Sequence, residues 1–248
     1  MSPDIEIIGD GCAALSLAAR ASELNHNIRL IKPSNAPTTN DHVWGFWSDP
    51  ILADAQQLAR ATWQKWAIIT HNDCAVLSSE TRPYNAFKRS DWSEHCKGLA
   101  ELSKVTIVGE HEWEKSADSL LFDTRPPVVP NDCMLQHFQG IEVKTKQPCF
   151  DKDMAILMDF RVDQSKGMHF IYLLPYSTTE ALVESTLFST ELVDEEFYST
   201  SIEGYLKEHC KVEEFSITHQ EKGVIPLGKL APHDAKIPGL GSNAGATR

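Results

Sequence analysis

The first 32 residues carry the clearest pattern of apolar and polar positions in the chain. Residues 5–8 read Ile-Glu-Ile-Ile and residues 28–31 read Ile-Arg-Leu-Ile, and each run predicts a short strand. Between them, residues 15–24 place leucine and alanine at helical spacing. A strand, a helix and a second strand within about 30 residues form a unit of the size that binds nucleotides.

The pattern becomes less regular from residue 50 to residue 122. It predicts helix in part of residues 50–66, a strand over 67–70, and strands over 105–108 and 119–122. Residues 90–102 read as a helix that Asp91 could cap, with Trp92, Cys96 and Leu99 on one face.

Longer strands are expected after residue 136. Ile156, Met158, Phe160 and Val162 alternate with polar or less apolar neighbours, which predicts a sheet with one buried face. Residues 168–175 and 180–188 are further strand candidates, and residues 194–209 form an acidic amphipathic helix. The fold class expected is α/β, a nucleotide-binding βαβ domain interleaved with a mostly antiparallel sheet domain.

Composition and charge narrow the function. The 248 residues include 23 Lys and Arg against 35 Asp and Glu, a net charge of −12 that argues against nucleic-acid binding. No apolar run approaches the ~20 residues that span a bilayer. The N-terminus lacks the basic region of a signal peptide, so a cytoplasmic location is expected. Six scattered cysteines without a CxxC pair argue against disulfides and structural zinc, and the histidines show no metal-ligand spacing.

Gly9-x-Gly11-x-x-Ala14 is a dinucleotide fingerprint between the first strand and the first helix. Gly9 would permit the tight turn, Gly11 would let backbone N–H groups approach a pyrophosphate, and Ala14 would let the helix pack closely. The alternative is a merely structural turn. Lys32 stands where an acidic residue usually holds the ribose, so either the ribose is held otherwise or Lys32 contacts a phosphate.

Two further features could carry chemistry. His42, Trp44, Phe46 and Trp47 form a ring cluster, which is either a core plug or a wall beside a flavin or a long apolar ligand. Glu184 lies on a strand that is apolar on both faces, so its carboxyl is expected to be buried, with the raised pKa that suits a general acid. The alternative is that Glu184 is a structural carboxylate, paired for example with Arg161. Asp159 and Arg161 could instead pair with each other.

Several motifs together resemble the bacterial lycopene beta-cyclase family. They are the fingerprint over residues 4–14, the aromatic segment 42–47, Phe122-Asp123-Thr124-Arg125-Pro126, Gln136-His137-Phe138-Gln139-Gly140, residues 158–164, residues 170–189 with Glu184-Ser185-Thr186-Leu187-Phe188-Ser189, and Gly223-Val224-Ile225-Pro226. Their order and spacing agree with the family over nearly the whole chain.

The resemblance implies a two-domain fold similar to flavin hydroxylases and geranylgeranyl reductases. Residues 1–45, 85–126 and 222–248 would form a discontinuous FAD-binding domain, and residues 46–84 and 127–221 a substrate domain. It also implies reduced FAD as cofactor, with NADPH or NADH as its reductant. The implied substrate is membrane-dissolved lycopene, and the implied location of the protein is peripheral on the inner membrane. The reaction is an isomerisation that closes β-rings without net redox change.

The resemblance further implies roles for individual residues. Glu184 would be the proton donor, although the family's motif has a second acidic residue where this chain has Ser185, and Asp159 is the next catalytic candidate. The expected cofactor-binding residues are Gly9, Gly11, Ala13, Ala14, Lys32, Asp123 and Arg125. The expected substrate residues are His42, Trp44, Phe46, Arg161 and Phe188, and no metal is expected.

Two other kinds of protein remain open at this stage. One is a flavin monooxygenase or reductase acting on an apolar isoprenoid, and the other is an inactive, truncated carotenoid-binding protein. The chain stops within residues 241–248, where the family's late glycine-rich flavin motif has only begun. The resemblance therefore implies either a partial sequence or a shortened protein that holds flavin poorly.

Overall fold

The structure is a computed structural model that describes residues 3–36 and 41–246. The chain divides into two compact units, the first formed by residues 1–39, 90–133 and 226–248 and the second by residues 40–89 and 134–225. Both units are thus assembled from separate stretches of sequence. The unit boundaries lie four to seven residues from the expected domain boundaries. The whole aromatic segment 42–47 belongs to the second unit, where residues 43–47 pair with residues 84–88.

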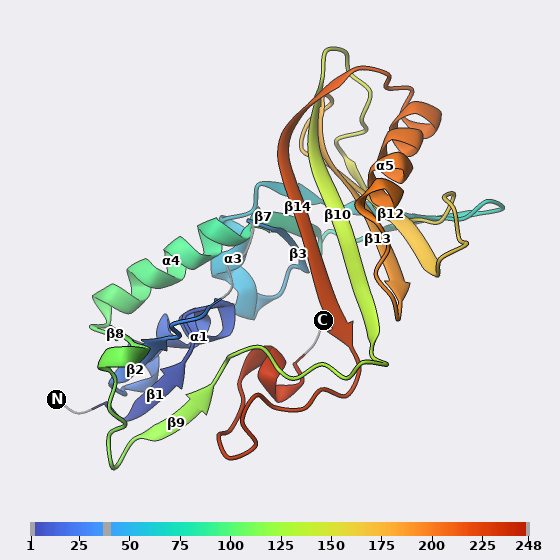
Figure 1. The fold of residues 1–248 in the computed structure, drawn as a ribbon. Coiled ribbons are helices and arrows are strands. Elements are labelled where there is room, and N and C mark those ends of the chain that lie inside the picture. The colour runs from blue at the N-terminus through green and yellow to red at the C-terminus, as the bar shows by residue number, and fades with distance from the viewer. Residues whose placement is uncertain (1–2, 37–40, 247–248) are drawn as a thin grey trace. The chain divides into compact units, whose positions relative to one another are not determined.

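The first unit contains a four-stranded sheet in the order β8-β2-β1-β9 (Figure 1). Its strands are β1 (Ile5–Ile8), β2 (Ile28–Lys32), β8 (Thr106–Gly109) and β9 (Leu120–Asp123), and all three pairings are parallel. The helix expected over residues 15–24 is two helices, α1 (Cys12–Ala18) and α2 (Ala21–Leu24), and α4 (Arg89–Leu102) precedes β8. Short 3-10 turns follow at η2 (Glu110–Glu112) and η3 (Gly241–Ala244).

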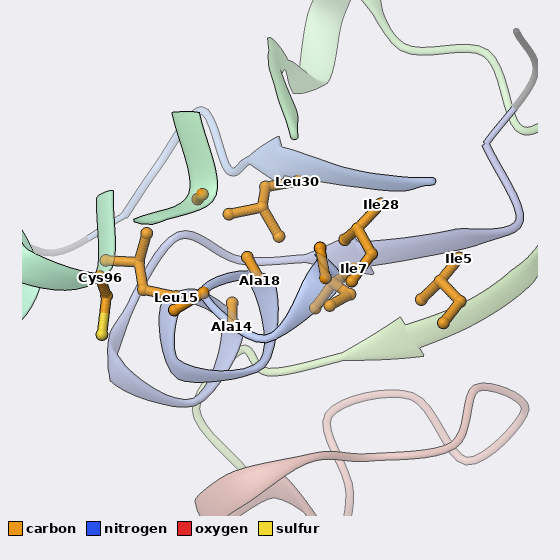
Figure 2. Close-up of a cluster of buried hydrophobic side chains, with 11 residues drawn as sticks. Ile5, Ile7, Ala14, Leu15, Ala18, Ile28, Leu30 and Cys96 are labelled. Carbon is orange, nitrogen blue, oxygen red and sulfur yellow. The ribbon is translucent and has the colours of Figure 1, made fainter. Parts of the chain in front are cut away.

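The core of this unit explains why the strand-helix-strand pattern folds in this way. Figure 2 shows Ile7 of β1, Leu30 of β2 and Ala14 and Ala18 of α1 in one buried cluster. Cys96, which lies on the predicted apolar face of α4, is fully buried in the same cluster. Small alanines on α1 let the helix lie close to the strands, as the fingerprint requires.

The second unit contains a seven-stranded sheet in the order β14-β10-β13-β12-β11-β5-β6. Figure 1 labels β14, β10, β13 and β12 of this sheet. The strands are β5 (Lys65–Ile69), β6 (Cys74–Ser78), β10 (Met134–Thr145), β11 (Met154–Asp159), β12 (Met168–Pro175), β13 (Glu180–Ser189) and β14 (Phe215–Leu227). Four of its pairings are antiparallel and that of β11 with β5 is parallel. The strand expected to reach Val162 ends earlier, at Asp159, where the register shifts.

Different layers cover the two faces of this sheet. Helix α5 (Glu195–His209) buries Ile202, Tyr205 and Leu206 against one face. On the other face a three-stranded sheet of β3 (Val43–Trp47), β7 (Tyr84–Lys88) and β4 (Ala61–Trp63) packs through Trp63 and Ala86 on Leu182. The prediction of helix in residues 50–66 holds only for η1 (Pro50–Leu52) and α3 (Ala53–Gln57), because Trp63 enters the core from a strand.

The expected fold class is confirmed. The first unit has the parallel βαβ arrangement, and the second is built around a largely antiparallel sheet.

Candidate functional site

Glu184 lies in the interior of the second unit, as its strand pattern predicted. It sits on β13, between β10 and β12, where its register partners are Gly140 and Tyr172. Only 9% of its surface is exposed, and the Thr186 hydroxyl donates a hydrogen bond of 2.7 Å to its Oε1. Because side chains alternate along a strand, Glu184 shares the face of Leu182, which packs on the three-stranded sheet.

A second carboxyl reaches Glu184 across a glycine. Glu221 belongs to β14, which is separated from β13 by β10. A Cβ atom built on Gly140 of β10 would lie 3.1 Å from Glu221 Cγ and 3.4 Å from Glu184 Cβ. The missing side chain at Gly140 therefore leaves the space in which side chains from two non-neighbouring strands meet.

Glu221 is almost completely withdrawn from water, with 2% of its surface exposed. The backbone N–H of Val43 donates a 2.8 Å hydrogen bond to its Oε2, and His219 Nε2 lies 3.7 Å from the same atom. Its Oε1 is buried, and no donor among the described residues lies at hydrogen-bonding distance and angle from this atom. Burial first, and then the neighbouring Glu184 carboxyl, raise the pKa of Glu221 to about 8.

Tyr176 is a third polar group in this neighbourhood. Its hydroxyl is buried and has no hydrogen-bond partner within the described part of the chain. Burial raises the pKa of Tyr176, and the charges of Glu142, Glu221 and Glu184 raise it further. Arg60 lies 4.0 Å from the Tyr176 ring centroid and forms a two-pronged ion pair with Glu142.

Aromatic rings continue along the same sheet face. Phe170 lies at ring-centroid distances of 5.2 Å from Tyr172, 5.6 Å from Phe188 and 5.5 Å from Phe160. Tyr172 is opposite Glu184 in the sheet register, and Phe188 is only partly buried. An acid on the same sheet face as aromatic rings is an arrangement that can both donate a proton and stabilise a positive charge.

Asp159 and Arg161, expected near the catalytic group, form a separate ion pair. Arg161 donates to both carboxylate oxygens of Asp159, and Tyr205 donates to Oδ2 at 2.9 Å. Burial alone would raise the pKa of Asp159, but the hydrogen bonds from Arg161 and Tyr205 outweigh it and hold that pKa below its usual value. Tyr205 comes from α5, so the Asp159–Arg161 pair lies on the sheet face opposite Glu184. The two residues pair with each other, which was one of the alternatives that the sequence allowed.

The aromatic segment does not lie as one group. His42 precedes β3, with Nε2 2.9 Å from the carbonyl oxygen of Lys222, the residue after Glu221, and with its ring edge-on to Phe138 at 5.9 Å. Trp44 and Phe46 instead contact Phe87, on the side of β3 away from the seven-stranded sheet. The second unit therefore brings His42, but not Trp44 or Phe46, to the neighbourhood of Glu184.

The fingerprint residues lie together in the first unit. Gly9 has φ +126°, and a Cβ there would lie 1.9 Å from Thr124 Oγ1, so only glycine fits. Gly11 precedes α1, and a Cβ there would meet nothing within 4 Å. Ala13 follows it, and Ala14 is buried against the strands. The fold thus requires glycine at position 9, whereas at position 11 the chain leaves open space.

The other expected cofactor residues border this turn. Lys32 ends β2 and is exposed, and Asp123 at the end of β9 is fully buried in a two-pronged ion pair with Arg125. The late glycine-rich segment packs against the same region, because a Cβ on Gly241 would lie 2.7 Å from Ala13 Cβ. Residues 247 and 248 of that segment lie outside the described residues.

Across residues 3–36 and 41–246, no group of three or more His, Cys, Asp or Glu side chains is placed to hold a metal ion. No helix in those ranges is both long and apolar enough to cross a membrane.

Glu221 is the residue that the sequence analysis missed. Glu221 stands two residues before the motif Gly223-Val224-Ile225-Pro226, and Gly140 lies in a segment expected to form a strand. A glycine within a strand often marks a close approach, and that was the available indication.

Solved structures with this fold have different activities. The chain aligns over 98% of its length with 71% of a geranylgeranyl bacteriochlorophyll reductase-like protein from Thermoplasma acidophilum, with a TM-score of 0.71 and 12% identity. It aligns over 96% of its length with 70% of a flavin-dependent brominase, with a TM-score of 0.62 and 11% identity. At these identities the likeness shows the fold alone.

Sequence comparisons are more specific. The chain is 32% identical to a lycopene beta-cyclase of Paracoccus sp. over 95% of its own length and 63% of the relative's. It is 24% identical to a chloroplastic lycopene beta cyclase of an Oncidium hybrid cultivar over 98% and 58% of the respective lengths. The chain therefore spans about 60% of the length of these curated relatives. Residues 4–248 match the family described as Lycopene cyclase protein, to which the chain accordingly belongs.

Proposed function

We propose that this chain carries the acid-catalytic part of a lycopene beta-cyclase. The observation that carries the proposal is the buried Glu184 carboxyl, held beside Glu221 on a sheet face lined by aromatic rings. Membership of the lycopene cyclase family supports the choice of substrate.

The reaction we propose is an isomerisation. A protonated carboxyl transfers its proton from Oε to the terminal alkene of lycopene, and the resulting cation is attacked by an inner double bond, which closes the ring. Loss of a proton from the ring carbon then forms the β-ring double bond, so one proton is given and one is returned. Glu184 is the proposed donor, and the aromatic rings of Tyr172 and Phe188 on the same sheet face would stabilise the positive charge.

We propose FAD as the cofactor of the first unit. The open space over Gly11, beside a turn that Gly9 alone can form, fits close approach of a pyrophosphate. Arg125, fixed by Asp123, and exposed Lys32 supply positive charge at the ends of the neighbouring strands. Bound reduced flavin would supply electron density that stabilises a carbocation, and NADPH or NADH would keep it reduced.

The nature of the substrate leads to a further proposal about location. Lycopene is a long hydrocarbon that partitions into membranes, so we propose peripheral contact of the protein with the cytoplasmic face of the inner membrane. The partly buried Phe188 lies at the aromatic end of the acid-bearing face and is the residue we propose to meet the chain of the substrate.

The test is expression of the chain in lycopene-accumulating cells, with pigment chromatography. We expect cyclised product from the wild-type chain, and unchanged lycopene from Glu184→Gln, because the amide keeps the shape but has no transferable acid proton; loss of a general acid costs about 10²–10⁴-fold. Glu180→Gln, at the exposed start of β13 in an ion pair with Lys144, is the matched control and should cyclise normally. Equal product from Glu184→Gln and the control would remove Glu184 from the mechanism.

A further inference from the structure

Among the described residues, the carboxyls withdrawn from water differ in how they are satisfied. Glu6 of β1 accepts hydrogen bonds from Ser119, Trp113 and Ser116, and Asp123 and Asp159 each hold an arginine through two atoms. Glu221 receives one backbone N–H and has a second oxygen with no normal partner. It is a carboxyl whose surroundings are arranged for a proton rather than for a cation.

No lysine or arginine among the described residues forms an ion pair with Glu221, and the basic side chain next to its carboxyl is His219. The ionisable groups around the pair are His219 on β14, Tyr172 and Tyr176 on and beside β12, and Glu142, whose charge is already paired with Arg60. His219 Nε2 also lies 2.7 Å from the Asp41 carbonyl oxygen, and His42 contacts the Lys222 carbonyl oxygen. Two buried carboxyls placed this close cannot both ionise at low cost.

We infer that Glu221 is a positioning residue that shares a single proton with Glu184, so that the two carboxyls act as one acid pair across Gly140. This inference rests on the proposed function, because it assigns the source of the proton that Glu184 delivers. At neutral pH the pair holds one proton and one negative charge. Transfer from Glu221 to Glu184 places the proton on the carboxyl that lies opposite Tyr172 in the sheet register.

Each turnover then balances within the pair. Glu184 gives the proton to the alkene, which leaves two carboxylates beside the carbocation. The proton lost when the β-ring double bond forms returns to the pair, which regains its starting charge. The pair thus gains electrostatic attraction for the cation at the moment the cation exists.

The first experiment needs neither substrate nor cofactor. Infrared difference spectra of the chain between pH 6 and pH 9.5 should show the carbonyl band of a protonated carboxyl that is lost as pH rises through about 8. We expect Glu221→Gln to abolish this titration, Glu221→Asp to restore it in part, and Glu214→Gln, an exposed partner of Lys146, to leave it unchanged. A wild-type chain without such a band, or a Glu221→Gln variant that retains the titration, would overturn the inference.

The second experiment follows cyclisation against pH. In wild type the rate should fall at high pH as the pair loses its proton. In Glu221→Gln this fall should begin at lower pH, and at a fixed high pH the rate should be about tenfold lower for every pH unit by which the profile moves. A structural role would change the rate equally at every pH, and a profile that does not move would refute the proton-sharing role. Absence of cyclised product from the wild-type chain would instead count against the proposed function, while the infrared result would still decide the pairing.

Discussion

Replacement of Glu221 by glutamine should change how the stability of the chain depends on pH. The amide has nearly the same shape, and its oxygen can still accept the hydrogen bond from Val43 N–H. It cannot ionise, however, so any contribution of the Glu221 titration to the free energy of unfolding disappears.

The sign follows from the direction in which folding moves the pKa. The pKa of Glu221 is raised from 4.5 to about 8 on folding, by burial and then by the Glu184 carboxyl. Between these values the folded chain holds a proton that the unfolded chain has lost, so the stabilising contribution is full below pH 4.5 and is lost as pH rises towards 8. At about 1.4 kcal/mol per pH unit, the loss between pH 4.5 and pH 7 is about 3 kcal/mol.

The assay is urea unfolding of wild type and Glu221→Gln at a series of pH values, followed by tryptophan fluorescence. Carboxylates with lowered pKa values, such as Glu6 and Asp159, titrate in both proteins and cancel in the difference. We expect the variant to gain about 3 kcal/mol relative to wild type from pH 4.5 to pH 7. Glu214→Gln, which removes an exposed carboxylate, should track wild type. A difference that stays constant across this range would refute the raised pKa.

Three further predictions test other parts of the structure. Gly11→Val should fold normally but lose FAD binding, measured by flavin absorbance. Gly9→Ala should lower the free energy of unfolding by about 1–3 kcal/mol, measured in urea, because of backbone strain at φ +126° and contact with Thr124. Loss of fold in Gly11→Val would contradict this contrast. Gly140→Ala should cost about 1–3 kcal/mol, because its Cβ meets Glu221 Cγ at 3.1 Å, and should also move the high-pH infrared titration; an unshifted titration would be the opposing result. Tyr205→Phe should cost about 1–3 kcal/mol in thermal or urea unfolding, because it removes a buried donor from Asp159, and a neutral effect would show that the hydroxyl is not needed there.

Local pattern was sufficient for much of the fold. The apolar runs around Ile7 and Leu30 and the alanines between them predicted the βαβ unit, and strand alternation predicted that Glu184 would be buried. It failed in residues 61–66, because short strands such as β4 leave little periodicity and are fixed by tertiary contacts of side chains such as Trp63.

The carboxyl pair was beyond the reach of periodicity. Alternation indicates which face of a strand a residue occupies, but not which strands become neighbours in a sheet. Glu221 meets Glu184 only because β10 separates β13 from β14 and has glycine at the crossing point. Likewise, Asp159 and Arg161 were correctly seen as possible partners, while the sheet face they occupy depends on Tyr205 of a distant helix.

The interleaving of the two units has a consequence for the order of folding. Asp123 at the end of β9 exchanges backbone hydrogen bonds with the segment that follows the second unit, at 2.9 Å to the Pro238 carbonyl and 2.8 Å from the Leu240 N–H. On the ribosome, that edge of the parallel sheet stays open until residues 134–225 have been synthesised, although β1 and β2 are made first. Pairings between such distant segments close late because the intervening loop must be ordered first. The β9 edge of the first unit is therefore unpaired for longest during synthesis, and an unpaired strand edge favours aggregation of a nascent chain.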